Sequence, residues 1–264
     1  MRNLKLFFIS LLALTGFYQI YAQPVMDELI NQFVSEDWNT VKNAKESLEN
    51  YEDKAIPKLM PLLDEDRIVK LKNTGSLIYP GAEKFFGYGQ IVDYDIDNIS
   101  IRAGWLLEEI SFNNFGFTGY HLPDEDLVGF IKITFPDYYN NSTNRKKIQS
   151  SSAAELRRLI HKLSVSKAKE WWEQNHGNWT RLQALVDALQ SFDEKRQVKA
   201  LFYIRNGTTR CTGLTKDFYI ENISKEIVRM SSSDTKRISE HARFILFDTK
   251  FEWLENKNSG DEPL

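Results

Sequence analysis

Cysteine is nearly absent from this chain of 264 residues. Cys211 is its single cysteine, so no disulfide can form within the chain. The fold must therefore be stabilised by packing, and the aromatic residues, 13% of the chain, are the expected means because each ring buries a large apolar area. A lone thiol is either buried or reactive, and burial is the commoner case.

Long apolar runs are missing beyond the first 22 residues. Within these residues, Arg2 and Lys5 precede an apolar stretch at residues 6–14, and a small residue follows at Ala22, which is the pattern of a secretory signal peptide. The stretch is shorter than the roughly 20 apolar residues that a membrane-spanning helix needs. We therefore expect residues 1–22 to be cleaved and the mature protein to be exported, either periplasmic or extracellular, without stable insertion into a membrane.

An excess of basic residues is also missing. The net charge is −3, and it becomes −5 without residues 1–22, which hold Arg2, Lys5 and no acid. Nucleic acid is therefore not an expected partner, because phosphate binding depends on clustered lysine and arginine side chains.

The motifs of common enzymes and metal sites are missing as well. The sequence contains no His-Glu-x-x-His, no Gly-x-Ser-x-Gly, no phosphate-binding loop and no dinucleotide-binding glycine motif. The sequence assigns no cofactor, no metal and no catalytic residue. The histidines, which have no metal-binding spacing, are His121, His161, His176 and His241.

Three aspartates partly match a calcium-binding loop. Asp93, Asp95 and Asp97 alternate as the first ligands of such a loop do. The loop needs glycine at its sixth position, where this chain has Asn98, and glutamate at its twelfth, where it has Gly104. We therefore interpret the three aspartates as solvated acids before a helix, with Asp97 as the N-cap.

What the chain does contain is a succession of amphipathic helix patterns. The clearest lies at residues 55–64, where Ile56, Leu59, Met60 and Leu63 follow the spacing of one helix face. The last pattern is apolar on most sides, which predicts that neighbouring helices cover it. The other expected helices, with short connections between several of them, lie at residues 24–33, 37–51, 98–110, 153–174, 179–192, 194–204, 215–230 and 235–255.

The segment at residues 55–66 resembles the second helix of a HEAT-type repeat, in which an Ala-Ile-Pro start leads into a leucine-rich run and an acidic turn. HEAT-type repeats are helix pairs that stack into a superhelix. The chain shows no strict self-similarity at a fixed period. The resemblance therefore implies an all-α fold, an irregular HEAT-like α-α superhelix, of a kind that usually acts as a protein-binding scaffold.

Two segments interrupt the helix patterns. Residues 73–97 are too rich in glycine for a helix and are predicted to form a long, aromatic, non-helical insertion. Residues 136–152 are polar and are predicted to be a linker.

The polar segment divides the chain into two helical regions. The N-terminal region is expected at residues 23–135 and the C-terminal region at residues 153–256. Residues 127–135, directly before the polar segment, fit a strand and a helix turn equally well. The polar tail at residues 257–264 is expected to be disordered.

Aromatic side chains cluster in the insertion and again after the helix that follows it. Two interpretations stay open, since exposed aromatic residues bind partners whereas buried ones pin a long insertion to the core. The binding interpretation assigns the surface to Tyr79, Phe85, Tyr88, Asp93, Tyr94, Asp95, Phe115 and Tyr120.

The expected function is non-enzymatic. The helical-repeat resemblance and the signal peptide together predict an exported protein that binds another protein, whose identity the sequence leaves open. The alternative is an enzyme that processes envelope glycan or peptide, with Cys211 as nucleophile or with Asp93, Asp95 and Asp97 as general acid and base. A thiol mechanism needs an accessible thiol, and a carboxylate mechanism needs two acids held at a defined separation.

Overall fold

The computed structural model describes residues 25–82, 89–207 and 209–248. Helices make up 69% of the described residues, and almost no strand occurs among them. The predicted signal peptide at residues 1–22 and the predicted tail at residues 257–264 lie outside the described residues. Among the helices described, none is both long and apolar enough to cross a membrane.

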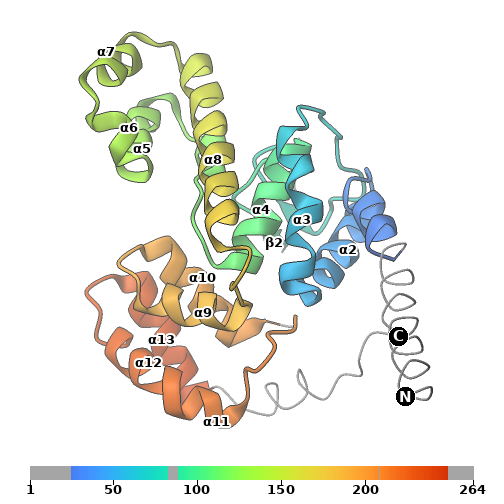
Figure 1. Ribbon diagram of the computed structural model, residues 1–264, viewed down its shortest axis with the longest axis vertical. Coiled ribbons are helices and arrows are strands. Elements are labelled where there is room, and N and C mark those ends of the chain that lie inside the picture. Colours follow the sequence, from blue (N-terminus) through green and yellow to red (C-terminus); the bar gives the residue numbers. More distant parts are fainter. Residues whose placement is uncertain (1–24, 83–88, 208, 249–264) are drawn as a thin grey trace, which may run out of the picture.

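The N-terminal part of the chain packs around helix α4 (Ile99–Ser111), which lies between α2 and α3 on one side and the long helix α8 (Ala153–Asn175) on the other (Figure 1). Twelve of the thirteen residues of α4 are buried. The elements before it are a helix over residues 25–33, α2 (Trp38–Asn50), η1 (Glu52–Lys54), α3 (Ile56–Leu59) and η2 (Pro61–Asp64).

The segment at residues 73–97 carries two short strands. Strand β1 (Leu77–Ile78) pairs in parallel with β2 (Gln90–Ile91), and the described residues of the segment contain no helix. The sequence pattern did not predict these strands, because two residues are too few to show the alternation of a strand.

The middle of the chain folds back over the start of α8 (Figure 1). A separate apolar cluster joins α5 to the residues of α7 and α8. The elements of this part are η3 (Phe117–His121), η4 (Asp124–Asp126), α5 (Leu127–Thr134), α6 (Pro136–Asn140) and α7 (Ser142–Ser150).

The prediction of a polar linker at residues 136–152 is wrong for its secondary structure, because α6 and α7 occupy it. Asn141 caps α7 by accepting backbone N–H bonds, and Ile148 is buried against α5 and α8. The polar residues therefore mark the exposed faces of two short helices, not a loop. For residues 127–135, the helical alternative is confirmed by α5.

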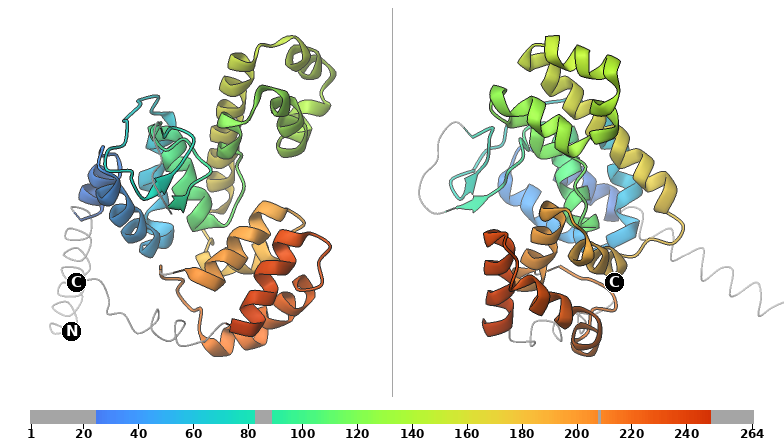
Figure 2. Two further views of the ribbon diagram at one scale, coloured as in Figure 1. Left: turned by 180° about the vertical axis from the view of Figure 1, so that it is seen from behind. Right: turned by 90° about the vertical axis from the view of Figure 1, so that its left-hand side faces the viewer.

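The C-terminal helices form a second group with its own core, seen beneath the N-terminal part in Figure 2. Phe112, which ends α4 with a positive φ of 51°, inserts into this core. Helix α10 packs against α9 and α13, and α12 packs against α13. The group comprises α9 (Arg181–Gln190), α10 (Glu194–Asn206), α11 (Lys216–Phe218), the π-helix η5 (Tyr219–Ile223), α12 (Ser224–Met230) and α13 (Lys236–Asp248).

Helix patterns located most of these helices, with local corrections. The single helix expected at residues 55–64 is broken into α3 and η2, because Pro61 has no N–H to continue the α-helical ladder. The N-cap of α4 is Asn98, not Asp97 as predicted, since Asn98 Oδ1 accepts the Ile101 N–H at 3.1 Å.

The prediction that neighbours cover the last helix on most sides is wrong for one row of α13. Ile238, Ala242 and Ile245 are buried against α10 and α12, whereas Phe244 is 37% exposed and Phe247 is 87% exposed. Among the described residues, α13 packs chiefly against α10 and α12, and this packing leaves Phe247 exposed. The rest of the predicted helix, beyond residue 248, lies outside the described residues.

Arg102 ties α4 to three earlier segments from inside the N-terminal core. Its side chain is fully buried and donates hydrogen bonds to the backbone oxygens of Phe33 (2.9 Å), Ser35 (2.8 Å), Ile96 (2.5 Å) and Val69 (3.1 Å). Buried carbonyls need such donors, because an unpaired one loses its solvation without compensation.

Replacing this donor should therefore destabilise the fold. We expect Arg102→Met to lower the free energy of unfolding by roughly 3–5 kcal/mol, measured by urea denaturation, because four buried or partly buried carbonyls lose this donor. Arg157→Met is the matched control, since Arg157 pairs with exposed Asp124 and should cost less than about 1 kcal/mol. Equal losses for the two variants would contradict the role assigned to Arg102.

Candidate functional site

A cleft of about 640 Å³ lies between the N-terminal part and the C-terminal helices. It is lined by residues of α2 and α4, by residues 90–94, and by residues of α10 and α13. This volume falls within the range of roughly 300–1,000 Å³ that is usual for binding pockets. Because the cleft draws residues from both parts of the chain, its shape depends on how the two parts are joined.

A buried ion-pair cluster lies at the base of the cleft, where α2 meets α9. Lys45 bonds to Glu49 one turn further along α2, and its Nζ lies 4.9 Å from the centre of the Trp105 ring. Arg181 Nη2 lies 3.8 Å from Glu49 Oε2. Burial opposes the charge on each group, but the opposite charges outweigh it, so the pKa of Glu49 is lowered and the pKa of Lys45 is raised.

Arg181 links α9 to two distant segments. Its side chain is 1% exposed, and its guanidinium carbon lies 5.4 Å from the ring centre of Phe112 and 4.8 Å from that of Tyr203. Its Nη1 donates to the backbone oxygens of Glu49 at 3.2 Å and Arg210 at 2.6 Å. These contacts fix the guanidinium rigidly at the junction of the two parts.

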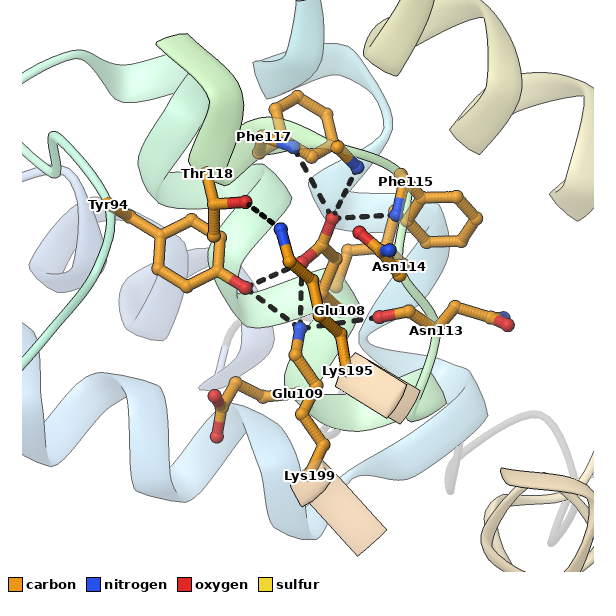
Figure 3. Close-up of polar contacts among 12 residues, drawn as sticks. Tyr94, Glu108, Glu109, Asn113, Asn114, Phe115, Phe117, Thr118, Lys195 and Lys199 are labelled. Carbon is orange, nitrogen blue, oxygen red and sulfur yellow. Dashed lines mark hydrogen bonds and ion pairs between the residues drawn. The ribbon is translucent and has the colours of Figure 1, made fainter. Parts of the chain in front are cut away.

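Glu108, near the end of α4, is bonded to three other segments (Figure 3). Its Oε1 accepts the backbone N–H of Phe115 at 2.7 Å and of Gly116 at 2.9 Å. Its Oε2 accepts the Tyr94 hydroxyl at 2.5 Å and Lys199 Nζ at 2.7 Å. One carboxylate therefore holds the loop after α4, the segment after β2, and helix α10.

The network around Glu108 favours its charged form. Burial opposes ionisation, but the Lys199 ammonium, the Tyr94 hydroxyl and the Gly116 N–H outweigh it and hold the pKa of Glu108 below the usual glutamate range. Burial, reinforced by the charge of Glu108, raises the pKa of Tyr94 well above the usual tyrosine range, so its hydroxyl stays protonated and can donate.

Further polar contacts join the loop after α4 to the first turns of α10. Lys195 Nζ donates to Thr118 Oγ1 at 2.9 Å, and Arg196 Nε donates to the Phe112 backbone oxygen at 3.2 Å. Asn114 Nδ2 donates to Asp193 Oδ2 at 3.1 Å. The junction of the two parts therefore combines these polar contacts with apolar contacts of Phe112 and Trp179.

The two aromatic segments meet beside the cleft. The loop after α4 folds back along the helix, so that His121 Nε2 lies 2.7 Å from Asp95 Oδ2. The sequence left open whether the segments before and after α4 come together, and this contact shows that they do.

Three of the predicted binding residues are buried. Tyr79 is 5% exposed, with its hydroxyl donating to Asp97 Oδ1 at 2.9 Å. Tyr94 is 5% exposed, and Phe115 is 2% exposed, with its ring centre 5.4 Å from that of Trp171. Their burial supports the interpretation in which aromatic residues pin these segments to the core.

The other predicted binding residues differ in their surroundings. Asp93 is exposed and lines the cleft. Asp95 is half-buried against His121, and half-buried Tyr120 packs on the same histidine ring. Phe85 and Tyr88 lie outside the described residues.

Two of the candidate catalytic residues of the alternative enzyme function, Cys211 and Asp97, are buried. Cys211 is 1% exposed in the C-terminal core, which confirms burial as the state of the lone thiol. Asp97 is buried and accepts the Leu71 N–H at 2.8 Å, so the interpretation of three solvated acids is wrong for Asp97. The described residues contain no group of three or more side chains suited to hold a metal ion.

Sequence reasoning missed the buried charges of the site. Lys45, Glu49, Arg181 and Lys199 were not singled out, because helix patterns assign charged residues to exposed faces. A signal did exist at Glu108, which shares a helix face with Ile101, Trp105 and Phe112 in the sequence. A charge on an apolar face indicates a buried pair, although it does not identify the partner.

The charge of Glu108 should be required for stability. We expect Glu108→Gln to lower the free energy of unfolding at pH 7 by roughly 3–5 kcal/mol, because Lys199 is left as an uncompensated, largely buried charge. Glu109→Gln is the control, since the Glu109 side chain is 35% exposed and should cost less than about 1 kcal/mol.

The same pair should show in the pH dependence of stability. Since the pKa of Glu108 is lower in the folded state, its contribution is complete above the unfolded pKa of about 4.3 and is lost as the pH falls through the folded value. Below about pH 4.3, the wild-type free energy of unfolding should therefore fall more steeply than that of Glu108→Gln. Parallel curves for the two proteins would show that Glu108 is not ionised in the fold.

The thiol of Cys211 should be protected. We expect a maleimide to modify it only after denaturation, because the folded protein buries it. Thr212→Cys is the control, because position 212 is exposed. In this variant, the thiol at position 212 should react in the native state and the thiol of Cys211 should not. Modification of both thiols in the folded variant would show that Cys211 is accessible and would support a nucleophilic role for it.

Comparison with known proteins adds no identification, since no protein-family model, curated protein or solved structure matches the chain. The function is therefore argued from the geometry of the cleft.

Proposed function

We propose that this is an exported, non-enzymatic protein that binds another protein in the cleft between its two helical parts. The signal-peptide pattern of residues 1–22 supports export to the periplasm or the extracellular space. The cleft supports the binding role, because it offers exposed apolar and charged side chains from both parts of the chain.

We also propose that the helices form an irregular HEAT-like α-α superhelix, with residues 73–97 as its insertion. Helices α9 and α10 pack together and are joined by residues 191–193, as the two helices of a repeat would be. Helices α12 and α13 also pack together across a short connection. Stacked helix pairs commonly bind other proteins along an extended surface.

The observation that carries the binding proposal is a pair of exposed apolar side chains in the cleft. Ile91 of β2 is 69% exposed, Phe202 of α10 is 54% exposed, and both line the cleft. Large apolar side chains that stay exposed in a concave site are the usual anchors of a protein interface.

Charged side chains of both signs surround these anchors. Asp93 is exposed beside β2, and Lys195 and Arg237 are exposed on the side of α10 and α13. Interfaces combine such a charged rim with an apolar centre, and the rim selects the partner and its orientation.

The buried charges support a binding role over a catalytic one. Glu49 and Glu108 are each neutralised by a basic partner, and Asp97 holds backbone groups of the N-terminal core. General acid and base catalysts must exchange protons with a substrate, whereas these carboxylates are committed to internal bonds.

The proposal is tested by photocrosslinking in the producing cell. A photoreactive phenylalanine analogue at position 202 should give a discrete adduct with another protein, because this side chain lies in the cleft. The same analogue at position 192 is the matched control, since Phe192 is fully exposed but does not line the cleft.

An adduct at position 202 that is absent at position 192 is the expected result. With the crosslinked partner purified, Phe202→Ala should weaken its binding at least tenfold, roughly 1.4 kcal/mol, without lowering the melting temperature. Equal adducts at both positions, or none at position 202, would contradict binding in the cleft.

A further inference from the structure

Strand β2 has one edge that pairs with β1 and one that is open. Gln90 N–H donates to the Ser76 oxygen at 2.8 Å, and Val92 N–H donates to the Ile78 oxygen at 2.9 Å. In a parallel ladder, the N–H and C=O of the residue between two such donors point to the opposite edge. The backbone groups of Ile91 therefore point away from β1.

The strand that carries this open edge lines the cleft. Within the part of the chain that the structure describes, β2 pairs with β1 alone, and Ile91 takes part in no other ladder. Residues 90–93 line the cleft. A two-stranded sheet of this size is marginal by itself, and an open edge with an exposed isoleucine is a template for another strand.

We propose that the cleft captures its protein partner as an extended segment that adds a third strand to the open edge of β2. The inference rests on the proposed function and specifies the form in which the partner binds. An unpaired N–H and C=O on one strand are complemented by the backbone of an extended polypeptide, and this mode of recognition gives affinity without a fixed side-chain sequence.

The opposite side of the cleft specifies the side chains of that segment. Phe202 of α10 offers an exposed apolar side chain, and Lys195 and Arg237 add two positive charges. Arg237 is exposed on α13, and Lys195 Nζ donates to Thr118 Oγ1 at 2.9 Å and lies 4.9 Å from the ring centre of Phe130. The bound segment therefore carries β-branched or aromatic residues together with an acidic residue.

The test selects a displayed library of twelve-residue peptides on the purified protein. Enriched peptides should contain β-branched or aromatic residues and an acidic residue. Ile91→Pro should weaken their binding at least tenfold, because proline removes the outward N–H while the bonds of Gln90 and Val92 to β1 remain. Ile91→Val keeps that N–H and should bind within twofold of the wild type.

A second readout leaves the protein unchanged. A strand presents every second N–H group to its neighbour. N-methylation of one alternating set of residues of an enriched peptide should therefore abolish binding, and N-methylation of the other set should be tolerated. Equal effects of N-methylation in both registers, or unchanged affinity for Ile91→Pro, would overturn strand addition.

The two proposals fail in different ways. If Phe202→Asp weakens the peptides and Ile91→Pro does not, the cleft binds its partner by another mode and only strand addition is wrong. If neither variant changes the affinity, the peptides bind elsewhere and the proposed site in the cleft is wrong as well. If no peptide is enriched, strand addition is overturned, and the crosslink at position 202 decides the cleft separately.

Discussion

The buried carboxylate of Glu108 is the interaction on which the geometry of the cleft depends. It accepts bonds from the loop after α4, from Tyr94 beyond β2 and from Lys199 of α10, so one side chain positions the base and both sides of the cleft. These donors come from segments that are far apart in the sequence. Removing the charge would leave Lys199 charged and unpaired in a largely buried site, and this destabilises a fold far more than the loss of a surface ion pair does.

The two helical parts have separate apolar cores, and directional bonds set the angle between them. Arg181 lies against the rings of Phe112 and Tyr203 and bonds to the backbone of α2, while Lys45 lies over Trp105 and pairs with Glu49. Such contacts tolerate little rotation, because each donor has a fixed acceptor. These bonds therefore join the two helical parts at the base of the cleft, beside the apolar contacts of Phe112 and Trp179.

The sequence predicted the helices well and the site poorly, for one physical reason. Apolar periodicity indicates which face of a helix is buried, so it located α4, α8 and α10. It failed at Ile148 of α7, which was assigned to a linker, because one apolar residue among polar ones shows no period. The site is built from charges whose partners are distant, such as Glu49 with Arg181. No local pattern identifies such a pair. The aromatic clusters were recognised, but whether a ring such as Tyr94 is buried depends on Glu108 and Lys199.

The proposed function places a partner protein in the cleft between the two parts. Amide hydrogen exchange with and without the crosslinked partner tests it most directly, because exchange reports protection at each backbone segment. Binding in the cleft predicts slower exchange at residues 90–94 and at α10, with no change at α5, α6 and α7, which do not line the cleft. Protection confined to α5, α6 and α7, or no protection at residues 90–94 and α10 under saturating partner, would contradict it.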